Sequence, residues 1–316
     1  MNHVHFVPRL FMVAVIVPTI KKEAMILQIQ KSFEPTKKGT LFLVPTPIGN
    51  LDDITVRTLK TLQNVDLVAS EDTRNTGKLL AHFEIKTSQI SFHEHNTQQR
   101  IPELIAELEA GHSIAQVSDA GLPSISDPGH ELVVAAIAED IPVVPLPGAS
   151  AGITALIASG LAPQPFYFYG FLPRKKKLLR AALEQLVDHP ETVILYESPH
   201  HLQRTLADLA TIFATERQLV LGRELTKLHE SFERGTLAEL QAWYQSHEPR
   251  GEYVILIAGQ LPKVEAAAAD LSDVALQAAV TALIDEGMRP NAAIKQVATR
   301  YDLSRQEVYQ RYHQLG

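Results

Sequence analysis

Two stretches decide the fold of this chain: GTLFLVPTPIGN at residues 39–50 and SIAQVSDAGLPSISDPG at residues 113–129. Each joins a short apolar run to a loop rich in glycine, proline or aspartate. Apolar runs of this length, bounded by turn residues, are typical of buried strands. Glycine lets the backbone approach a ligand closely, and proline fixes the loop before the ligand arrives. Both stretches therefore indicate a strand that ends in a ligand-binding loop.

Strands and helices alternate on either side of these stretches. We expect strands at residues 41–44, 65–69, 90–92, 113–117 and 142–146, and helices at residues 53–62, 77–83, 102–109 and 130–139. This βαβ order predicts a mostly parallel sheet with helices on both faces. Loops 71–74 and 147–150 then join loops 45–50 and 118–129 at the carboxyl edge of the sheet, where open α/β sheets bind ligands. One such loop would be an ordinary turn, whereas several at one edge indicate a binding crevice.

A second α/β unit begins near Ser150. We expect helices at residues 151–159, 178–187 and 202–213, and strands at residues 166–171, 192–196, 218–222 and 253–258. Residues 260–270 are alanine-rich and interrupted by proline, like a linker. Short helices follow at residues 274–285, 291–300 and 304–313. Ser304 and Glu307 form a capping box there, and the outline is a helix-turn-helix, with a packing or dimerisation bundle as the alternative.

The predicted organisation is an N-terminal extension, two α/β domains and a small helical domain. The segments are residues 1–38, 39–148, 149–260 and 271–316. Residues 11–18 are apolar and loosely resemble a signal peptide, but they are short and no small-residue cleavage site follows. They are also too short to span a bilayer. We interpret them as an upstream extension, with Met25 as a candidate start of the native protein, and expect no membrane association.

Composition and missing motifs exclude several classes of protein. The chain has no cysteine, which rules out disulfides and thiolate chemistry and fits a cytoplasmic protein. A net charge of −7 argues against a generally basic nucleic-acid-binding coat. The sequence contains no dinucleotide fingerprint and no Walker loop. The histidine pairs His93/His95 and His200/His201 lack a third ligand at readable spacing, so we expect no metal.

Five segments in order carry a resemblance to one family. They are residues 39–50, 69–74 (ASEDTR), 118–129, 147–151 (PGASA) and 196–200 (YESPH). They resemble the tetrapyrrole-methylase-like (class III) methyltransferases, and within that class the bacterial enzymes that 2′-O-methylate a cytidine of 16S ribosomal RNA. The resemblance covers about residues 40–258. It implies a two-domain fold with a mostly parallel first sheet and a mixed second sheet, S-adenosyl-L-methionine as cofactor, and a homodimer.

By motif position, the resemblance also implies which residues hold the cofactor. They are Pro47, Ile48, Gly49, Asp119, Gly121, Leu122, Pro123, Ser124, Ser150, Ala151, Tyr196 and Arg223. A ribose hydroxyl is a weak acid, so a base or a cationic neighbour would help the attack. The candidates are Asp72, Glu224 and Lys227, and Glu197 is a further one. Alternatives for three of them are a helix cap (Asp72), a partner of Arg204 (Glu197) and a solvated side chain (Lys227).

Positive charge for RNA is concentrated in one run despite the acidic total. Its residues are Arg174, Lys175, Lys176, Lys177 and Arg180, and Arg74 and Arg100 are weaker candidates. Such a run is usually a solvated face, but the resemblance favours phosphate anchoring. The expected partner is ribosomal RNA or the small ribosomal subunit. The alternatives are methylation of a corrinoid or porphyrin precursor, and a non-catalytic RNA-binding protein.

Overall fold

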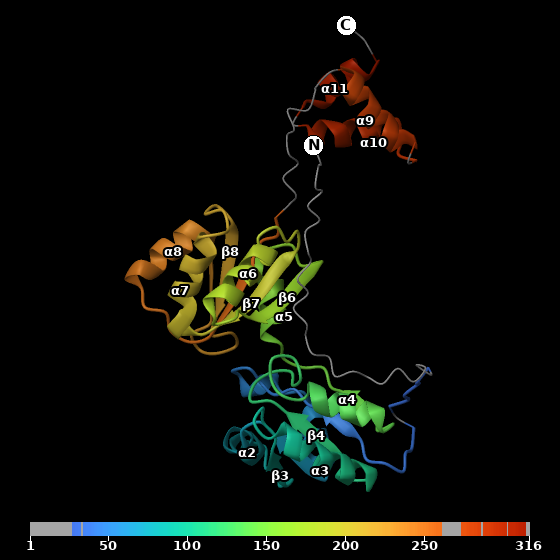
Figure 1. Ribbon diagram of the computed structural model, residues 1–316, viewed down its shortest axis with the longest axis vertical. Helices are drawn as coiled ribbons and strands as arrows, with labels where there is room; N and C mark the ends of the chain where they lie inside the picture. The colour runs from blue at the N-terminus through green and yellow to red at the C-terminus, as the bar shows by residue number, and fades with distance from the viewer. Residues whose placement is uncertain (1–26, 33, 261–272, 286, 302, 314–316) are drawn as a thin grey trace, which may run out of the picture.

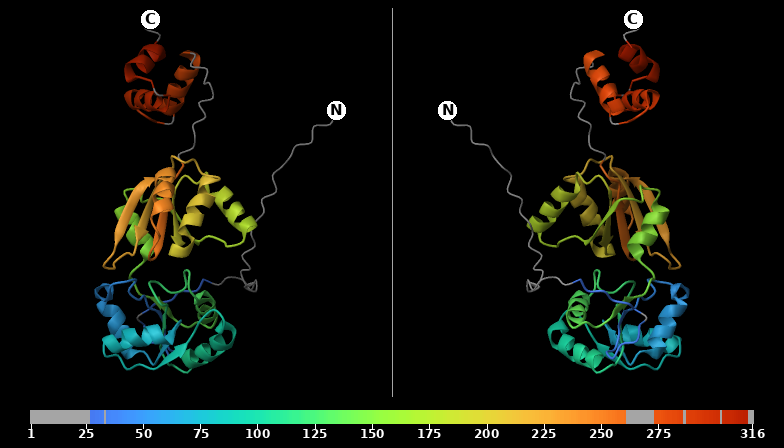
Figure 2. Two further views of the ribbon diagram at one scale, coloured as in Figure 1. Left: turned by 90° about the vertical axis from the view of Figure 1, so that its left-hand side faces the viewer. Right: turned by 90° about the vertical axis from the view of Figure 1, so that its right-hand side faces the viewer.

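The computed structural model describes residues 27–32, 34–260, 273–285, 287–301 and 303–313. Figures 1 and 2 show one layered α/β unit, a second one stacked on it, and a group of helices beyond the second. The proposed start at Met25, the residues before it and most of the predicted linker lie outside the described residues. The division into four segments stays a prediction.

The first unit is built on a parallel sheet. Its strands are β1 (Leu41–Leu43), β2 (Leu67–Ser70), β3 (Gln89–Ser91), β4 (Ile114–Val117) and β5 (Val143–Pro145). They lie in the order β3-β2-β4-β1-β5, and each neighbouring pair is parallel. The carboxyl ends therefore meet at one edge, and the expected mostly parallel sheet is confirmed. Successive residues of β4 alternate between two apolar clusters, with Ala115 in one and Ile114 in the other, so both faces are covered.

Several helices of the first unit begin at residues other than those predicted from the sequence. The elements are η1 (Leu51–Asp53), α1 (Val56–Asn64), α2 (Thr73–His82), α3 (Thr97–Glu109) and α4 (His130–Ala138). The cap of α1 is Thr55, whose hydroxyl accepts from the backbone of Thr58 at 3.0 Å, and Asp52 and Asp53 belong to η1. Asp72 caps α2, accepting from the backbone of Arg74 at 2.8 Å. This confirms the capping alternative for Asp72.

The second unit is built on a mixed sheet, as expected. Its strands are β6 (Phe166–Phe171), β7 (Thr192–Glu197), β8 (Gln218–Arg223), β9 (Ser231–Thr236) and β10 (Tyr253–Ile257). They lie in the order β6-β7-β10-β8-β9, with β6 and β7 parallel and the other pairs antiparallel. Strand β9 is missing from the sequence-based expectation because SFERGT lacks an apolar alternation. It forms at the edge by pairing along the length of β8.

Helices cover the two faces of this sheet unequally. They are α5 (Ala151–Ser159), α6 (Lys176–Leu186), α7 (Pro199–Ala210) and α8 (Leu237–Ser246). Apolar residues of α6, α7 and α8 form the larger core with one face, including Leu183, Leu206 and Leu240. Residues of α5 cover the other face, with Ala155 and Leu156 against the sheet. This thinner layer leaves the end of the sheet open toward the first unit.

The C-terminal helices have their own apolar core. They are α9 (Asp273–Asp285), α10 (Pro290–Arg300) and α11 (Arg305–His313). Val280, Ile294 and Val308, one from each helix, meet in that core. The Ser304 hydroxyl accepts from the backbone of Glu307 at 3.1 Å, which is the N-capping half of the predicted box. Among the described residues, no helix has the length and apolar character needed to cross a membrane.

Candidate active site

A cavity of about 550 Å³ lies where the carboxyl edge of the first sheet faces the second sheet. This size suits a nucleotide-sized ligand. From the first unit it is lined by Ile48, Glu71, Asp119, Ala120, Gly121, Leu122, Ile125, Ser126 and Asp127. From the second unit it is lined by Ser150, Ala151, Gly152, Ile153, Phe166, Phe168, Phe171, Tyr196, Glu197, Ser198, Gly222, Leu225, Lys227, Glu252, Tyr253 and Val254. Each of the four loops expected at the sheet edge contributes to it.

The two loops that decide the fold are joined by backbone pairing. Thr46 and Gly121 exchange two hydrogen bonds of 3.0 Å, and the Thr46 hydroxyl donates to the carbonyl of Ser118 at 3.1 Å. Gly121 has a φ of +80°, which disfavours a side chain. A Cβ there would also lie 3.3 Å from Ile48. Glycine therefore lets the second loop lie against the first while both face the cavity.

Carboxylates form one wall of the cavity. The backbone N–H of Asp119 donates to Glu71 at 3.2 Å, which links the loops after β2 and β4. Burial raises the pKa of Glu71, a backbone hydrogen bond from Asp119 lowers it, and nearby acidic groups raise it further. Burial also raises the pKa of Asp127, against a hydrogen bond from Ser118 that lowers it. The wall is thus an acidic cluster that lacks full compensation, and a positively charged ligand would stabilise it.

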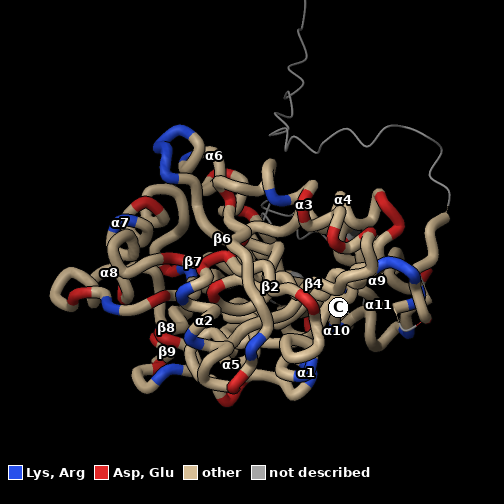
Figure 3. The backbone as a smooth tube through the Cα atoms, turned by 90° about the horizontal axis from the view of Figure 1, so that it is seen from below, with Lys and Arg blue, Asp and Glu red and all other residues tan. Residues whose placement is uncertain are grey.

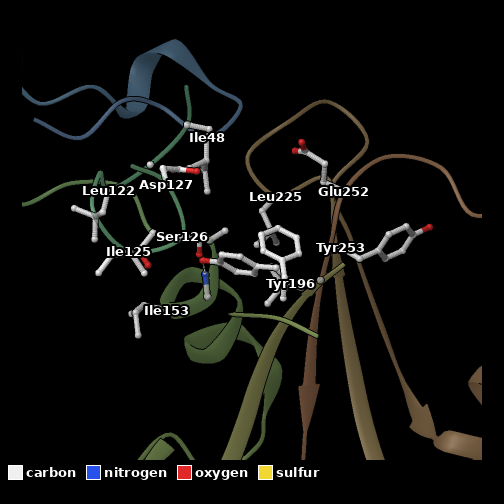
Figure 4. Close-up of a pocket in the computed structure, with 18 of the residues that line it drawn as sticks. Ile48, Leu122, Ile125, Ser126, Asp127, Ile153, Tyr196, Leu225, Glu252 and Tyr253 are labelled. Atoms are coloured by element: carbon white, nitrogen blue, oxygen red, sulfur yellow. Dashed lines mark hydrogen bonds between the residues drawn. The ribbon is translucent and has the colours of Figure 1, made fainter. Parts of the chain in front are cut away.

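Aromatic side chains form the opposite wall. The register of β6 against β7 shifts between Phe168 and Gly170. Because of this bulge, Phe168 and Phe171 both face the cavity although a regular strand would separate them. The Tyr196 hydroxyl accepts from the backbone of Gly152 at 3.0 Å, drawn as a dashed line in Figure 4. That bond holds the ring against the start of α5.

An ion cluster closes the rim where β8 and β10 meet. The Lys227 ammonium donates to Glu224 at 2.8 Å and to Glu252 at 2.9 Å. Partial burial lowers the pKa of Lys227, but the two carboxylates outweigh it and raise the pKa overall. Burial raises the pKa of Glu224, but the hydrogen bonds from Lys227 and from the backbone of Glu252, together with the charges of Lys227 and Arg223, lower it overall. Lys227 is therefore held as a cation and is poorly suited to be a base.

The predicted cofactor residues divide into two groups. Those that line the cavity are Ile48, Asp119, Gly121, Leu122, Ser150, Ala151 and Tyr196. Those outside its lining are Pro47, Gly49, Pro123, Ser124 and Arg223. Gly49 packs against the loop that carries Lys227, and Ser124 accepts from the Gln116 amide at 3.4 Å. Arg223 donates to the carbonyl of Arg250 at 2.6 Å. These residues support the lining, and their role in binding stays a prediction.

The catalytic candidates are also separated. Lys227 lines the cavity, whereas Asp72 and Glu224 do not. Side-chain and backbone hydrogen bonds from Arg74 hold the pKa of Asp72 far below its usual range. That carboxylate is a weak base, and it faces Arg74 at 2.6 Å. Glu71, the residue before it, faces the cavity instead.

The RNA candidates lie around the start of α6, on α2 (Arg74) and on α3 (Arg100). Arg174, Lys175, Lys176, Lys177 and Arg180 are exposed, and Figure 3 shows this blue stretch beside the start of α6. Arg180 bonds Glu184 at 2.8 Å along α6. Arg74 is 85% exposed and paired with Asp72, and Arg100 is paired with Glu103. Among the described residues, Lys175, Lys176 and Lys177 form no ion pair, whereas Arg174 lies 3.6 Å from the Glu197 carboxylate.

One alternative from the sequence is wrong. Glu197 does not brace Arg204, which lies 3.6 Å from Asp208 instead. The Glu197 carboxylate accepts from the Thr205 hydroxyl at 2.6 Å and lies 3.6 Å from the Arg174 guanidinium. The residue of α7 that contacts Glu197 is Thr205, the neighbour of Arg204. The side chain of Arg204 lies on the outer face of α7 and is 57% exposed.

Several lining residues were not among the predictions. They include Glu71, Ile125, Ser126, Asp127, Phe168, Phe171, Leu225 and Glu252. Glu71 and Asp127 lie inside loops already recognised as ligand-binding, so loop position was a usable signal. Leu225 and Glu252 follow and precede strands of the second sheet, and only the packing of the two units brings them in. In the described part of the chain, no group of three potential metal ligands lies together.

The residues that line the cavity suit S-adenosyl-L-methionine. Its sulfonium and ammonium groups are cations, which the wall of Glu71, Asp119 and Asp127 would stabilise. Its adenine ring is flat and apolar, like ligands that enter cavities lined by aliphatic and aromatic side chains. Ile48, Leu225 and their neighbours supply such a lining. The residues present therefore fit this cofactor.

The fold and the site define a methyltransferase class. A sequence model of the tetrapyrrole (corrin/porphyrin) methylases matches residues 40–241, and the chain belongs to this family. S-adenosyl-L-methionine is its cofactor. Ribosomal RNA small subunit methyltransferase I of Streptococcus pyogenes is 53% identical to this chain over 290 residues, which is 92% of this chain and 100% of the relative. The protein of that name from Bacillus subtilis is 45% identical over 289 residues, 91% of this chain and 99% of the relative.

Solved structures share the fold at lower sequence identity. Cobalt precorrin-4 methyltransferase, a cobalamin biosynthetic enzyme, matches with a TM-score of 0.55 at 19% identity, over 69% of this chain and 94% of that one. Diphthine synthase matches with a TM-score of 0.55 at 14% identity, over 70% of this chain and 90% of that one. The predicted α/β fold of this class is confirmed.

Proposed function

We propose that this chain transfers a methyl group from S-adenosyl-L-methionine to the 2′-oxygen of a cytidine ribose in small-subunit (16S) ribosomal RNA. The observation that carries the proposal is the match, over essentially their whole length, to relatives named for methylation of that RNA. A basic run on the surface supports an RNA substrate, since phosphate contacts supply most sequence-independent affinity. A cytoplasmic location follows from that substrate.

We propose distinct roles for the charged groups around the cavity. The cofactor supplies an activated methyl group on a good leaving group, so the protein mainly binds and orients. The acidic wall would hold the cationic end of the cofactor. Glu71 and Asp127, whose pKa values are raised, suit acceptance of the ribose hydroxyl proton better than Asp72 does. The Lys227 ammonium would stabilise negative charge on the attacking oxygen.

A methyl-transfer assay tests the proposed function. Tritium-labelled cofactor is offered with small ribosomal subunits, naked small-subunit RNA and a tetrapyrrole precursor. We expect label in RNA, and after alkaline hydrolysis we expect it in a dinucleotide that begins with cytidine, because a 2′-O-methyl group blocks cleavage at that position. Label in the tetrapyrrole alone would contradict the proposal and favour the corrinoid or porphyrin alternative. Absence of cofactor binding by calorimetry would favour the non-catalytic alternative.

We also propose that the chain acts as a homodimer. Apolar side chains are exposed at the cavity, with Ile153 on α5 and Phe166 on β6, and Ile157 is exposed one turn further along α5. Ile157 is 77% exposed. Grouped apolar side chains on a surface favour association. Sedimentation equilibrium should give twice the chain mass, and Ile157→Glu should shift the mass toward the monomer. A monomer for the unaltered chain would contradict the proposal.

A further inference from the structure

A buried carboxylate lies in the cavity wall at the end of β7. The side chain of Glu197 is 4% exposed, and the residue lines the cavity. One oxygen accepts from the backbone of Ser198 at 2.9 Å and the other from the Thr205 hydroxyl at 2.6 Å. Two neutral donors do not balance the charge of a buried carboxylate, which needs a cation nearby. The Arg174 guanidinium, 3.6 Å away, supplies it.

The topology of the second sheet brings this pair together. Strands β6 and β7 are parallel neighbours, with Phe171 opposite Tyr196. Arg174 follows the end of β6 and Glu197 ends β7, so both lie at the same sheet edge. Thr205 lies on α7, which begins directly after β7, and holds the carboxylate from behind. The guanidinium thus reaches from a buried anchor to solvent, where its side chain is 57% exposed.

This anchor distinguishes Arg174 from the rest of the basic run. Lys175, Lys176 and Lys177 are exposed at the start of α6. Arg180 is tied to Glu184 on the outer surface of the same helix, away from the cavity lining. A flexible lysine attracts phosphate without fixing its position, whereas a held guanidinium can bind two phosphate oxygens in a defined direction. The run therefore has one positioned cation and several mobile ones.

We propose that Glu197, held by Thr205, is a positioning residue that fixes Arg174 at the mouth of the cavity. There Arg174 binds the RNA phosphate next to the methyl-accepting ribose and sets where that ribose stands. The inference rests on the proposed function, because it assigns a substrate contact to an RNA methyltransferase. A small misplacement of reacting groups is costly in a displacement reaction, so the pair should affect turnover more than binding.

The test measures single-turnover methylation of unmethylated small ribosomal subunits, at saturating enzyme and cofactor, together with RNA affinity at several salt concentrations. We expect Arg174→Ala to lower the rate about tenfold or more. The salt slope of RNA affinity should fall by about one phosphate contact. Glu197→Gln keeps the cation and should lower the rate by a similar factor while leaving the salt slope unchanged. In the Arg174→Ala background, Glu197→Gln should add little, since its effect acts through the arginine.

Matched variants separate positioning from general damage. Arg204→Ala removes an arginine of α7 that is as exposed as Arg174, pairs with Asp208 and lies outside the cavity lining, and it should leave the rate unchanged. Thr205→Val removes the hydroxyl behind Glu197 without touching the cavity and should reproduce the rate loss, whereas Thr205→Ser should restore it. Cofactor affinity by calorimetry should stay within about twofold for both Thr205 variants, because cofactor binding does not depend on Arg174.

Two kinds of result would contradict these proposals, one the role of Glu197 and Arg174 and the other the proposed function. If Glu197→Gln lowers the rate as much in the Arg174→Ala background as in the unaltered chain, Glu197 does not act through Arg174 and the inference is wrong. It is equally wrong if Arg204→Ala lowers the rate as much as Arg174→Ala does. If the unaltered chain labels no ribosomal RNA, the proposed function itself fails, and the inference fails with it.

Discussion

Gly49 lies where the two units pack together, and there is no room for a Cβ atom at this position. A Cβ at this position would lie 2.5 Å from the Lys227 side chain and 2.9 Å from the carbonyl of Leu225. The carbonyl cannot move without shifting the loop after β8. We expect Gly49→Ala to weaken cofactor binding and to destabilise the fold by about 1–3 kcal/mol, the usual cost of overpacking. Calorimetry and urea unfolding measure both.

A second glycine serves as the matched control for Gly49. Gly77 lies inside α2, where a Cβ would meet only the flexible end of the Gln89 side chain, at 3.1 Å. Gly77→Ala should therefore leave cofactor affinity unchanged and stabilise the fold by up to about 1 kcal/mol. Equal losses of affinity in the two variants would show that close approach at Gly49 is not the cause.

The acidic wall predicts how cofactor affinity depends on pH. Burial raises the pKa values of Glu71 and Asp127 above their ordinary 4.5 and 3.8 in the free protein. A cationic ligand prefers the ionised carboxylates, so binding should release protons and affinity should be lost as pH falls through the raised values. Because these pKa values are raised in the folded state, the two groups lower the stability of the cofactor-free protein as pH rises through them. Calorimetry at a series of pH values from about 4 upward to neutral should show affinity increasing with pH.

Asp127→Asn should flatten that pH profile, because one of the titrating groups is removed. The matched control is Asp53→Asn, a carboxylate in η1 outside the cavity lining, and it should leave the profile unchanged. Affinity that is independent of pH in the unaltered chain would mean that the carboxylates do not face the cationic end of the cofactor.

Two adjacent carboxylates show where residue-level prediction stops. The motif ASEDTR identified the right loop, but Asp72 was chosen as a catalytic candidate and Glu71 was not. The choice depends on the start of α2: Asp72 turns to cap the helix, and Glu71 is left facing the cavity. The sequence pattern predicts that this helix begins at Gly77, whereas it begins at Thr73 with Asp72 as its cap. Motif order therefore located the pocket, and helix capping decided which side chain faces it.

At the scale of elements, apolar strands were predictable and polar ones were not. Strand β10 is a continuous apolar run, β4 is apolar except for Gln116, and both lie within their expected ranges. Strand β9 and helix α8 were absent from the expectation, although Thr236 and Glu239 form a complete capping box that marks the start of α8. The bulge in β6 was equally invisible, since Phe168 and Phe171 share a face only because the register slips. Pairing partners, rather than local propensity, determine these features.

The capping box of α8 gives an element-scale prediction. The Thr236 hydroxyl accepts from the backbone of Glu239 at 3.2 Å, and Glu239 accepts from the backbone of Thr236 at 2.8 Å. Thr236→Ala should lower the free energy of unfolding by about 1 kcal/mol, with Thr236→Ser close to the unaltered chain. Because α8 covers the face opposite α5, cofactor affinity should not change. Urea unfolding and calorimetry measure the two quantities, and a loss of affinity would contradict the separation of the faces.

At the scale of the molecule, the site belongs to the two α/β units, and the helical group beyond them stands apart in Figure 1. The last residue of the sequence that lines the cavity is Val254. Arg217 holds the chain where it leaves the second sheet, donating to the carbonyls of Ala258 at 2.9 Å and Val187 at 2.8 Å. Helices α9, α10 and α11 share a core of their own. The cavity should therefore form without them.

A chain that ends at Gln260 tests this independence. It keeps the Arg217 contacts, including the one to the Gln260 side chain, and the whole cavity lining. We expect it to bind S-adenosyl-L-methionine with an affinity within about twofold of the full chain, since sites far apart with no shared contacts behave additively. Arg217→Ala in that shortened chain removes the contacts that hold its new end, and it should lower the midpoint of thermal unfolding. If the shortened chain unfolds or loses cofactor affinity while keeping those contacts, the helical group is part of the site, and the boundary near residue 260 is wrong.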